Sequence, residues 1–446
     1  MEETQRAVQG VTGPLQAAPE TLRRKNLRHN YKWAVTDGIF AYVGSGMVPP
    51  FIAIMALSYG ADSIGLSLLN LLPALFNTIL FMPFAAIAER EGGVKRLVLI
   101  SGYATRSAFL LMAIVPFMPE ASRAGMLIGL NAVQSIPAVL YLIAWTDMMG
   151  GAFPQREWGM VFSRRNAFAN FSAVIATMSA GFLIDWLPGG WGYFSVFIIS
   201  GATGLLSIYS LQQMREIPAI KKQPRKISPL RRLAMPFADK SLGRKFTYFC
   251  LGLFLFNLGM FISGPAFSIF YVKELALSKS TISLLMTTGT LFVVVGSPFW
   301  GWLSRRRSNA VIFAYSTIWQ ALFPYFYYLS GHSIPQMMAW QAILGIGVAG
   351  YNLSMFNLSM EYVDEAERPN GIAATNTVIF AAAAIGSLIS GPLTKHMGIE
   401  AAFLASMIVR LSGWAVFLAV FEPQKIMGKV LKGMESKHHN RGKKDS

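Results

Sequence analysis

The sequence predicts an all-α membrane protein with twelve transmembrane helices in two six-helix halves. Three observations support this prediction: the apolar composition, the length of the apolar runs and an internal repeat. The chain of 446 residues is 53% hydrophobic and 14% charged, whereas soluble domains carry about 25% charged residues. A helix needs roughly 20 mostly apolar residues to cross a bilayer. Because backbone polar groups in lipid must be paired within their own segment, runs of that length are expected to be helices.

Six apolar runs precede a polar break and six follow it. We expect the first six spans at 33–58, 63–88, 97–117, 124–148, 165–187 and 191–212. We expect the second six at 246–272, 279–303, 309–329, 334–360, 370–395 and 400–421. The outer connections between these runs are very short, so neighbouring helices are predicted to pack antiparallel.

The repeat consists of proline, glycine and arginine landmarks that recur at offsets of 210 to 215 residues. The pairs are Pro50 and Pro265, Pro83 and Pro298, Arg156 and Arg368, and Gly181 and Gly391. Several pairs in the same order indicate a duplication. Duplicated membrane-spanning halves of this size are typical of secondary transporters.

Polar segments flank and divide the two halves. The predicted organisation is an N-terminal tail at 1–30, a first half at 31–212, a basic linker at 213–245, a second half at 246–421 and a basic tail at 422–446. Prolines interrupt the linker and the tails are polar, so none of these three segments is expected to form a packed fold.

The positive charge is distributed unevenly between the two sides of the predicted membrane. The net charge is +17. If both termini lie on one side, the loops of the other side hold only Arg123, Lys273, Lys279 and Lys395 among the 39 basic residues. The positive-inside rule then predicts a multi-pass protein of the cell membrane with both termini in the cytoplasm. Its basic loops would attract anionic inner-leaflet lipids, so the charge does not call for a nucleic-acid partner.

The sequence offers no pattern for catalysis, a metal or a cofactor. The single cysteine, Cys250, lies in the seventh predicted span and has no second cysteine with which to form an internal disulfide. Neither a nucleophile–base constellation nor a phosphate-binding loop is evident. We therefore expect a protein that is not an enzyme and carries no cofactor.

The turn between the second and third spans resembles a known family signature. Residues 86–96 read AIAEREGGVKR, and the major facilitator superfamily has Gly-x-x-x-Asp-Arg-x-Gly-x-Arg-Arg at this place. Here alanine replaces the first glycine and the spacing fits with a slip of one residue. A second copy at 301–307 reads GWLSRRR and lacks the acid. With two six-helix halves and a long central loop, residues 31–421 resemble this superfamily, which implies halves related by a pseudo-two-fold axis and a monomeric carrier of small molecules.

The resemblance also implies a gate at these basic turns. In relatives the turn locks the halves together when the carrier faces outward. Glu89, with Arg90 or Arg96, would then pair near Asp147 at the inner end of the fourth span. The matching residues in the second half are Gly301 and Arg305. The alternative is a topology signal with a solvated acid.

Two adjacent arginines, Arg164 and Arg165, are expected at the start of the fifth span. The helix dipole disfavours cations at a helix start. An acidic partner or a phospholipid contact would explain them, and so would a topology signal alone.

The sequence departs from proton-coupled drug exporters of the same superfamily in two places. Those exporters usually carry a buried arginine in the fourth span, where this chain has none below Arg123. They also carry Gly-Pro in the fifth span, where this chain has Gly181-Phe182. Both departures argue against that subclass and leave the fold prediction intact.

Charged residues inside predicted spans are functional candidates, because charge in a membrane is costly. Asp37 is the candidate for proton coupling, since burial makes a carboxylate easier to protonate, and Arg106 is the second candidate. The alternative for Asp37 is an acid at a helix start, stabilised by the dipole. Arg410 is expected to be structural or to extend toward the membrane interface.

Polar and aromatic residues of spans one, four, seven and ten are the candidates for binding substrate, since these spans line the cavity in relatives. The candidates are Tyr42, Asn131, Gln134, Asn257, Tyr351 and Asn352. Such a wall would suit a moderately polar organic solute, because ring faces supply area and amides supply orientation. Alternatively, the amides hold helices together.

These patterns predict a secondary active transporter for a small organic solute, with proton-coupled export as the first expectation. The alternatives are uptake or facilitated diffusion of a metabolite, and a non-transporting receptor or scaffold that keeps the carrier fold.

Overall fold

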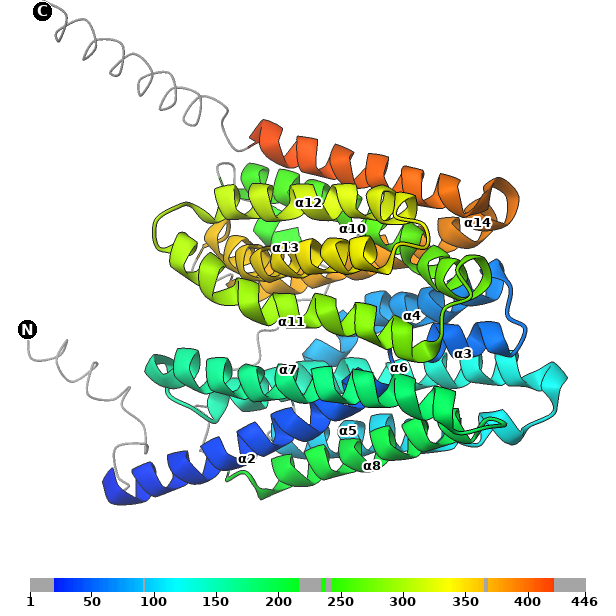
Figure 1. Cartoon of the computed structure of the whole chain (residues 1–446). Coiled ribbons are helices and arrows are strands. Elements are labelled where there is room, and N and C mark those ends of the chain that lie inside the picture. The colour runs from blue at the N-terminus through cyan, green and yellow to red at the C-terminus, as the bar shows by residue number, and fades with distance from the viewer. Residues whose placement is uncertain (1–19, 91–92, 216–233, 238–241, 365–367, 421–446) are drawn as a thin grey trace, which may run out of the picture.

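The computed structural model describes residues 20–90, 93–215, 234–237, 242–364 and 368–420, which are largely helical and include no strand (Figure 1). The first group of helices, the N-terminal bundle, contains α2 (Glu20–Met47), α3 (Ile52–Ser58), α4 (Ser63–Arg90), α5 (Val94–Met112), the 3-10 helix η2 (Val115–Phe117), α6 (Glu120–Gly151), α7 (Gln155–Trp186) and α8 (Trp191–Gln213). The second group, the C-terminal bundle, contains α10 (Leu242–Ile269), the π-helix η3 (Phe270–Glu274), α11 (Lys279–Ser304), α12 (Asn309–Leu329), α13 (Ile334–Glu361) and α14 (Arg368–Val420).

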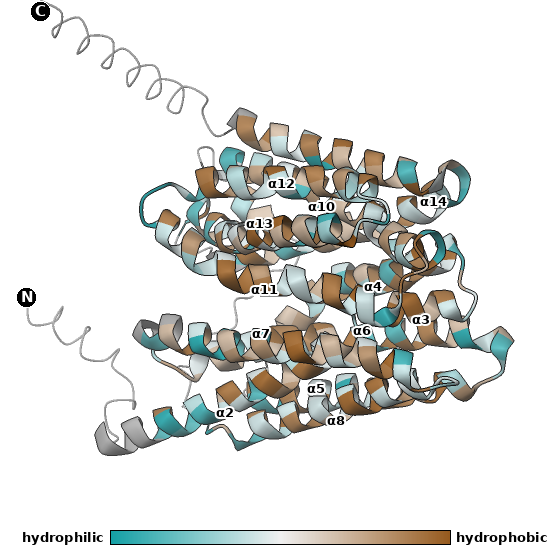
Figure 2. Cartoon of the chain, viewed as in Figure 1, coloured by the Kyte–Doolittle hydropathy of each residue, from teal (hydrophilic) through white to brown (hydrophobic). Residues whose placement is uncertain are grey.

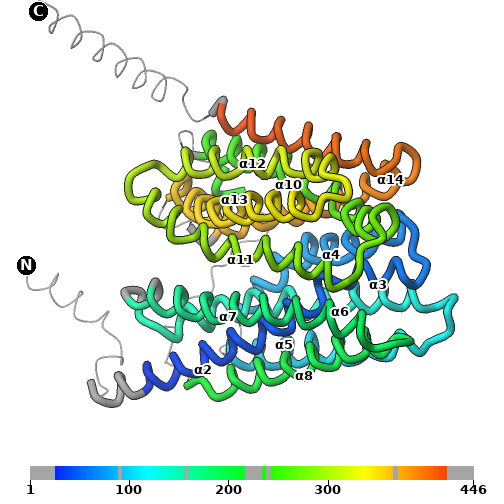
Figure 3. Tube along the Cα trace, in the orientation of Figure 1, coloured from blue at the N-terminus to red at the C-terminus, as the bar shows by residue number. Residues whose placement is uncertain are grey.

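Ten helical stretches of the described chain are long and apolar enough to cross a membrane. One of them, Asn370–Leu418, is divided at Gly398, whose φ of 85° and ψ of 174° are not helical. Glycine reaches a positive φ without the penalty that a Cβ brings. Helix α12 is 21 residues long but rich in tyrosine, which lowers its hydropathy. With α12 and the two arms of α14 counted, the structure is consistent with the twelve predicted spans, and Figure 3 lets the chain be followed through them.

Two helices begin earlier than their apolar runs. α2 begins at Glu20, before the boundary expected at residue 31, and α7 begins at Gln155, before the span expected at residue 165. Leucine, arginine and lysine, which are common in the first turns of α2, favour helix without needing an apolar environment. Apolar runs therefore locate the spans but underestimate the helices.

The two bundles lie side by side, and their helices run in roughly one direction (Figure 1). They contact each other mainly where α4 packs against α14 and where α7 packs against α11, with smaller contacts of α3 and α4 with α10. The start of α2 and the end of α14 lie toward the same side, which we call the terminal end. The opposite side, the far end, carries the connections 59–62, 187–190 and 275–278.

The largest cluster of buried apolar residues is a core shared by both bundles at the far end, and separate cores lie toward the terminal end. A small second cluster, Ala74 of α4 with Ala383 and Ala384 of α14, also joins the bundles. The shared core contains Phe51 and Ile54 of the N-terminal bundle and Phe270 and Phe403 of the C-terminal bundle. Toward the terminal end, each bundle has its own core. The N-terminal bundle uses Val98, Met149 and Ile208, and the C-terminal bundle uses Phe249, Phe313 and Phe417. The bundles are therefore packed together most extensively at the far end.

The outer surface agrees with a membrane environment. Figure 2 shows apolar residues along the lengths of the helices and polar residues gathered toward their ends. Large apolar side chains such as Ile79, Val133 and Ile408 are more than half exposed. A band of exposed apolar side chains is what lipid-facing helices require.

Candidate functional site

A buried ion pair joins three helices of the N-terminal bundle. Asp37 of α2 accepts a hydrogen bond from Arg165 Nη2 of α7 at 2.8 Å. Its other oxygen accepts a hydrogen bond from the Ser207 hydroxyl of α8 at 2.7 Å. The two charged side chains are 0% and 5% exposed. The structure therefore confirms the acidic partner that was one explanation for Arg165.

Arg165 was predicted to lie at a helix start, where the helix dipole disfavours a cation, and this prediction is wrong. Arg165 lies ten residues inside α7, which begins at Gln155, so it is not in the first turn of the helix. Likewise, Asp37 lies well inside α2, which begins at Glu20, and the explanation as a helix-start acid fails. The arginine acts instead as the counter-charge of a carboxylate on another helix.

The neighbours of Arg165 explain how a long cationic side chain fits between helices. A Cβ built on Gly38, beside Asp37, would lie 2.9 Å from Arg165 Cγ, so glycine leaves room for the arginine to cross α2. On the other side, the guanidinium carbon lies 4.7 Å from the centre of the Trp145 ring of α6. This cation–π contact supplements the ion pair where water is scarce.

The ion pair belongs to one bundle only, and this bears on proton coupling. Asp37, Arg165 and Ser207 lie on α2, α7 and α8, three helices of the N-terminal bundle. Movement of one bundle relative to the other does not by itself separate these residues.

Arg106, the second candidate for proton coupling, lies on α5 of the same bundle. Its stem packs against Gly204 of α8, where a built Cβ would lie 2.6 Å from Arg106 Cδ. Its guanidinium carbon lies 5.8 Å from the centre of the Tyr141 ring, and its buried Nε has no hydrogen-bond partner among the described residues. Gly204 and Ser207 are three residues apart and share a face of α8. Arg106 and Asp37 are thus held against the same face of one helix.

Arg410 is enclosed in the C-terminal bundle and does not extend to an interface. It is 4% exposed. Its Nη1 donates to the backbone oxygen of Gln320 at 2.8 Å, and its Nη2 donates to the Ser263 hydroxyl at 2.9 Å. Of the two alternatives for Arg410, the structural one therefore holds and extension toward the membrane interface does not.

Two of the candidate substrate residues bind each other. Asn257 Nδ2 of α10 lies 3.1 Å from the Tyr351 hydroxyl of α13 and also donates to Leu253 O at 2.8 Å. Both side chains are buried. Their polar groups hold α10 to α13 in this conformation.

Asn352 lies next to this pair but has an exposed side chain. On the same helix, Tyr351 faces α10, and Gly345 and Ala349 face α11. At 3.6 residues per turn, Asn352 points between those two directions. Its amide makes no hydrogen bond to another described residue, so it is available to a ligand.

The candidate substrate residues of the N-terminal bundle also include both kinds, one bonded to another helix and two with free polar groups. Asn131 Nδ2 of α6 donates to Leu69 O of α4 at 2.9 Å, so its amide connects two helices. Tyr42 and Gln134 are half-buried, and neither is hydrogen-bonded within the part of the chain that the structure describes. Free polar groups therefore remain at Tyr42, Gln134 and Asn352.

The residues proposed as a gate lie at the terminal end, and those whose side chains the structure describes do not pair with one another. Glu89 and Arg90 end α4, and their side chains lie outside the described residues. Arg96 and Asp147 are exposed and form no ion pair with each other. In the second copy, Arg305 is exposed at the end of α11.

Gly301 of the second copy has open space around its Cα. A Cβ built on it would meet nothing within 4 Å. Gly301 therefore makes no close helix contact in this conformation.

The polar contacts that join the bundles within the described chain all lie at the far end. The Asp185 carboxylate, at the end of α7, accepts hydrogen bonds from the backbone N–H groups of Lys279 and Ser280 at the start of α11, at 3.1 and 2.7 Å. Lys395 Nζ of α14 lies 3.6 Å from a carboxylate oxygen of Asp62. Hydrogen bonding from Gly65 N–H, together with the charge of Lys395, holds the pKa of Asp62 below its usual value. None of these residues was predicted from the sequence as a site residue, although Lys279 and Lys395 are among the few basic residues expected in the outer loops.

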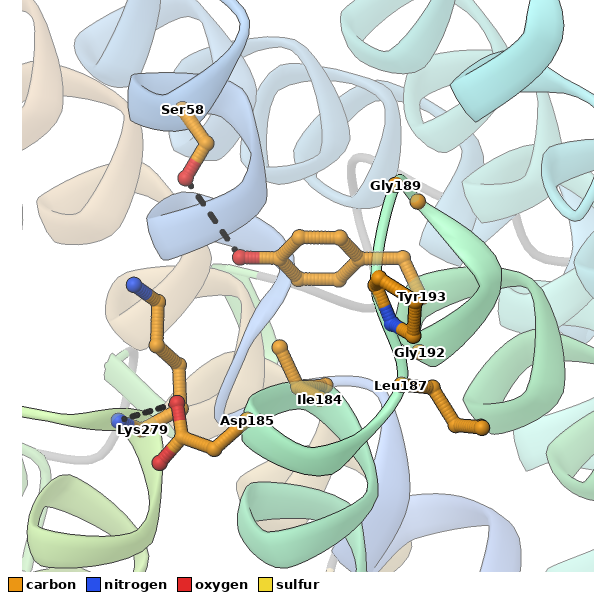
Figure 4. A pocket seen from close by; sticks show the side chains of 10 residues that line it. Ser58, Ile184, Asp185, Leu187, Gly189, Gly192, Tyr193 and Lys279 are labelled. Carbon is orange, nitrogen blue, oxygen red and sulfur yellow. Dashed lines mark hydrogen bonds between the residues drawn. The ribbon is translucent and has the colours of Figure 1, made fainter.

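A cavity of about 320 Å³ lies beside the first of these contacts. Ser58, Asp185, Tyr193 and Lys279 line it, together with glycines of the connection after α7 (Figure 4). The Ser58 and Tyr193 hydroxyls lie 3.4 Å apart across it. None of the candidate substrate residues lines this cavity.

Comparison with known families decides the class of the chain. The model of the Major Facilitator Superfamily matches residues 38–247 and 249–440. The chain belongs to the Major Facilitator Superfamily. It is a multi-pass membrane protein of a transporter family, and the resemblance of residues 31–421 to this superfamily is confirmed.

Curated relatives match only part of this superfamily member. The multidrug resistance protein MdtG of Salmonella choleraesuis is 25% identical over 163 residues, which are 34% of this chain and 40% of that protein. MdtG of Yersinia enterocolitica is 27% identical over 169 residues, 35% of this chain and 40% of that protein. The chain thus matches about two fifths of the length of these relatives.

Solved structures support the fold over most of the chain. The crystal structure of the nucleoside transporter NupG has a TM-score of 0.64 at 13% identity and covers 88% of this chain and 99% of that one. A POT family transporter solved with 5-aminolevulinic acid has a TM-score of 0.66 at 14% identity and covers 89% of this chain and 95% of that one.

Proposed function

We propose that this protein is a secondary transporter that moves a small organic solute across the cell membrane by alternating access. The observation that carries the proposal is the asymmetry of the seam between the bundles. At the far end the bundles share a core and polar contacts. Toward the terminal end each has a core of its own. This arrangement is what a carrier closed at the far end requires.

We assign the terminal end to the cytoplasm. The Lys and Arg residues of the loops are concentrated there, as the positive-inside rule demands of the cytoplasmic side. The N-terminal and C-terminal bundles, which correspond to the predicted halves 31–212 and 246–421, would rock about the α4–α14 and α7–α11 contacts. Glu89, Arg90, Arg96 and Asp147, with Gly301 and Arg305, would meet when the terminal end closes.

We place the solute between the bundles, against the free polar groups of Tyr42, Gln134 and Asn352. The bonded pair of Asn257 and Tyr351 would fix the rotation of α13 and thereby the direction of Asn352. Asn131 would fix α6 on α4 in the same manner. Aromatic and amide groups together suit an amphipathic organic compound.

We propose export coupled to proton entry as the direction and energy source. The multidrug resistance proteins among the relatives support export, and Asp37 supplies the buried carboxylate. Protonation of Asp37 would break its ion pair with Arg165 and leave the arginine against Trp145, with Arg106 as the neighbouring charge. The proton would therefore act through the packing inside the N-terminal bundle.

Flux into proteoliposomes tests the proposal. Purified protein would be reconstituted, and the movement of ethidium, a cationic aromatic probe, would be followed with and without a pH gradient. We expect faster movement of ethidium when the pH gradient drives protons in the opposite direction. Asp37→Asn should lose this dependence on the gradient. If the flux through the unaltered protein does not depend on the pH gradient, proton coupling is ruled out and facilitated diffusion is favoured.

A second test separates a carrier from a scaffold with the same fold. Gln134→Cys and Asn352→Cys, each in a Cys250→Ala background, would be labelled with a membrane-impermeant maleimide from either side. A carrier exposes each position alternately to the two sides. Labelling restricted to one side under every condition would favour the scaffold.

A further inference from the structure

We propose that Asp185 is a latch that holds the far end closed by capping the first turn of α11 from the opposite bundle. The inference rests on the proposed alternating access and names the contact that must break when the far end opens. It is carried by the hydrogen bonds across the seam, by a close helix approach beside them, and by a second, weaker copy of the same arrangement.

The carboxylate satisfies groups that α11 does not satisfy itself. The first turn of a helix leaves N–H groups without partners in the helix. Ser278 accepts the hydrogen bond of Thr281 N–H at 3.2 Å within its own chain segment. The N–H group of Lys279 instead donates to Asp185 (Figure 4). The N–H group of Ser280 does the same, and the Ser280 hydroxyl adds a third hydrogen bond at 2.7 Å. The cap of α11 is thus divided between two bundles.

The charge of Asp185 suits this position. The N-terminus of a helix carries partial positive charge, which stabilises a nearby carboxylate. Hydrogen bonds from backbone N–H groups to an ionised acceptor are also stronger than those between neutral groups. If the bundles separate, the Asp185 carboxylate and the two N–H groups lose each other as partners and become hydrated.

A close approach of the two helices sets the geometry of the latch. Gly181 lies one turn before Asp185 on α7. A Cβ built there would lie 2.6 Å from Lys279 O and would also overlap the hydroxyl of Ser283. Only glycine allows α7 to lie this close to α11, and this closeness brings the carboxylate within reach of the helix start.

The same arrangement occurs a second time between α14 and α4. Gly391 and Lys395 follow Gly181 and Asp185 by 210 residues. A Cβ built on Gly391 would lie 2.6 Å from Ser67 Oγ and 3.1 Å from Ser63 O. Ser63 and Ser67 precede Lys279 and Ser283 by 216 residues. The α7–α11 contact and the α14–α4 contact are therefore formed by equivalent positions of the repeat.

The chemistry of the second copy is different and weaker. Here Asp62 caps its own helix, since it accepts the hydrogen bond of Gly65 N–H at 2.9 Å. Lys395 contributes one ion pair at 3.6 Å, with side chains 49% and 57% exposed. Exposed ion pairs of this kind contribute little. Loss of Lys395 leaves α4 capped, whereas loss of Asp185 leaves α11 uncapped at two positions.

Thiol labelling at Thr287 tests the latch. Thr287 is buried, lies one turn from Ser283 on the same face of α11, and its hydroxyl has no partner among the described residues. Thr287→Cys would be introduced with Cys250→Ala and labelled from the far side with a membrane-impermeant maleimide. Because Thr287 is buried, the maleimide can reach the thiol only after the far end opens, so opening should determine the labelling rate.

We expect Asp185→Ala to increase the labelling rate about fivefold, which is the factor that corresponds to loss of a typical helix cap. Lys395→Ala is the matched control and should change the rate less than twofold. Asp185→Asn, which keeps one acceptor oxygen, should lie between the two. Ser122→Cys, exposed at the far end, should label at one rate in every variant.

The outcomes separate the latch from the transport proposal. If Thr287→Cys labels in the unaltered protein and Asp185→Ala and Lys395→Ala have equal effects, the latch is overturned while alternating access stands. If the thiol is never labelled in any variant, the far end does not open, and the proposed function is overturned together with the latch.

Discussion

The two bundles differ in how they hold their buried charges. In the N-terminal bundle, Asp37 and Arg165 neutralise each other, with Ser207 as a further donor. In the C-terminal bundle, Arg410 is bonded to a backbone oxygen and a hydroxyl, and none of the described carboxylates is paired with it. One bundle therefore depends on two charges that need each other, and the other tolerates a single charge among neutral groups.

The remaining interior of the C-terminal bundle relies on aromatic and hydroxyl contacts. Phe313 and Phe417 stack with ring centres 4.2 Å apart. The Tyr271 hydroxyl donates to the Tyr327 hydroxyl at 2.9 Å. Such contacts lose modest amounts of stability when one partner is altered. A buried ion pair loses much more when one partner is removed, because the other charge stays buried.

The largest effect is expected for Asp37→Ala. It leaves Arg165 buried without its carboxylate, and the free energy of unfolding should fall by about 3–5 kcal/mol. Denaturant unfolding of the detergent-purified protein measures this. The double variant Asp37→Ala with Arg165→Met should recover most of the loss, since neither charge remains. Asp147→Asn, at an exposed acid of the same bundle, is the control and should change little.

A loss confined to the double variant would contradict this account of the N-terminal bundle. So would an Asp37→Ala protein that unfolds at the same denaturant concentration as the unaltered one.

An intermediate effect, equal in the two bundles, is expected where helices approach most closely. A Cβ on Gly46 would lie 2.6 Å from Ala173 O, and a Cβ on Gly345 would overlap Gly289 O. Alanine at either position should cost about 1–3 kcal/mol through overpacking, as measured by the same unfolding experiment. Gly129→Ala, which meets nothing within 4 Å, is the control and should not destabilise. A clear difference between the two close approaches would show that packing, as well as charge, distinguishes the bundles.

The smallest effect is expected for Arg410→Met. Methionine fills a similar volume and removes a charge that lacks an acidic partner, so the change should stay within about 1 kcal/mol. Thermal unfolding in detergent would be compared with that of Arg165→Met, which strands the Asp37 carboxylate and should be much less stable. If both methionine variants lose the same stability, the contrast between the bundles is wrong.

The sequence was sufficient to predict the fold and the charged residues worth following, because apolar length and the cost of intramembrane charge are local properties. It was not sufficient to predict partners. Asp37 and Arg165 are 128 residues apart, and their contact depends on how α2 and α7 rotate against each other. The same rotation decides that Asn257 is bonded to Tyr351 while Asn352 stays exposed.

The latch at Asp185 was missed for a related reason. A carboxylate at the end of an apolar run reads as an ordinary boundary residue. Its partners are backbone N–H groups of a helix that begins 94 residues later, and backbone groups leave no mark in a sequence. The nearest available signal was the spacing of Gly181 and Gly391 in the repeat, which marks the position of both seams.

The most direct test of the account is a pair of distance measurements by electron spin resonance on doubly labelled protein in nanodiscs. One protein would carry labels toward the terminal end, at Ser163 of α7 and at Ser308, which precedes α12. The other would carry labels at Trp186 and Ser278, at the far ends of α7 and α11. Rocking of the two bundles predicts two distance populations in each protein, with opposite responses to Asp185→Ala: the far-end pair moves apart as the terminal-end pair draws together. A single unchanging distance in both proteins would contradict the rocking of two bundles.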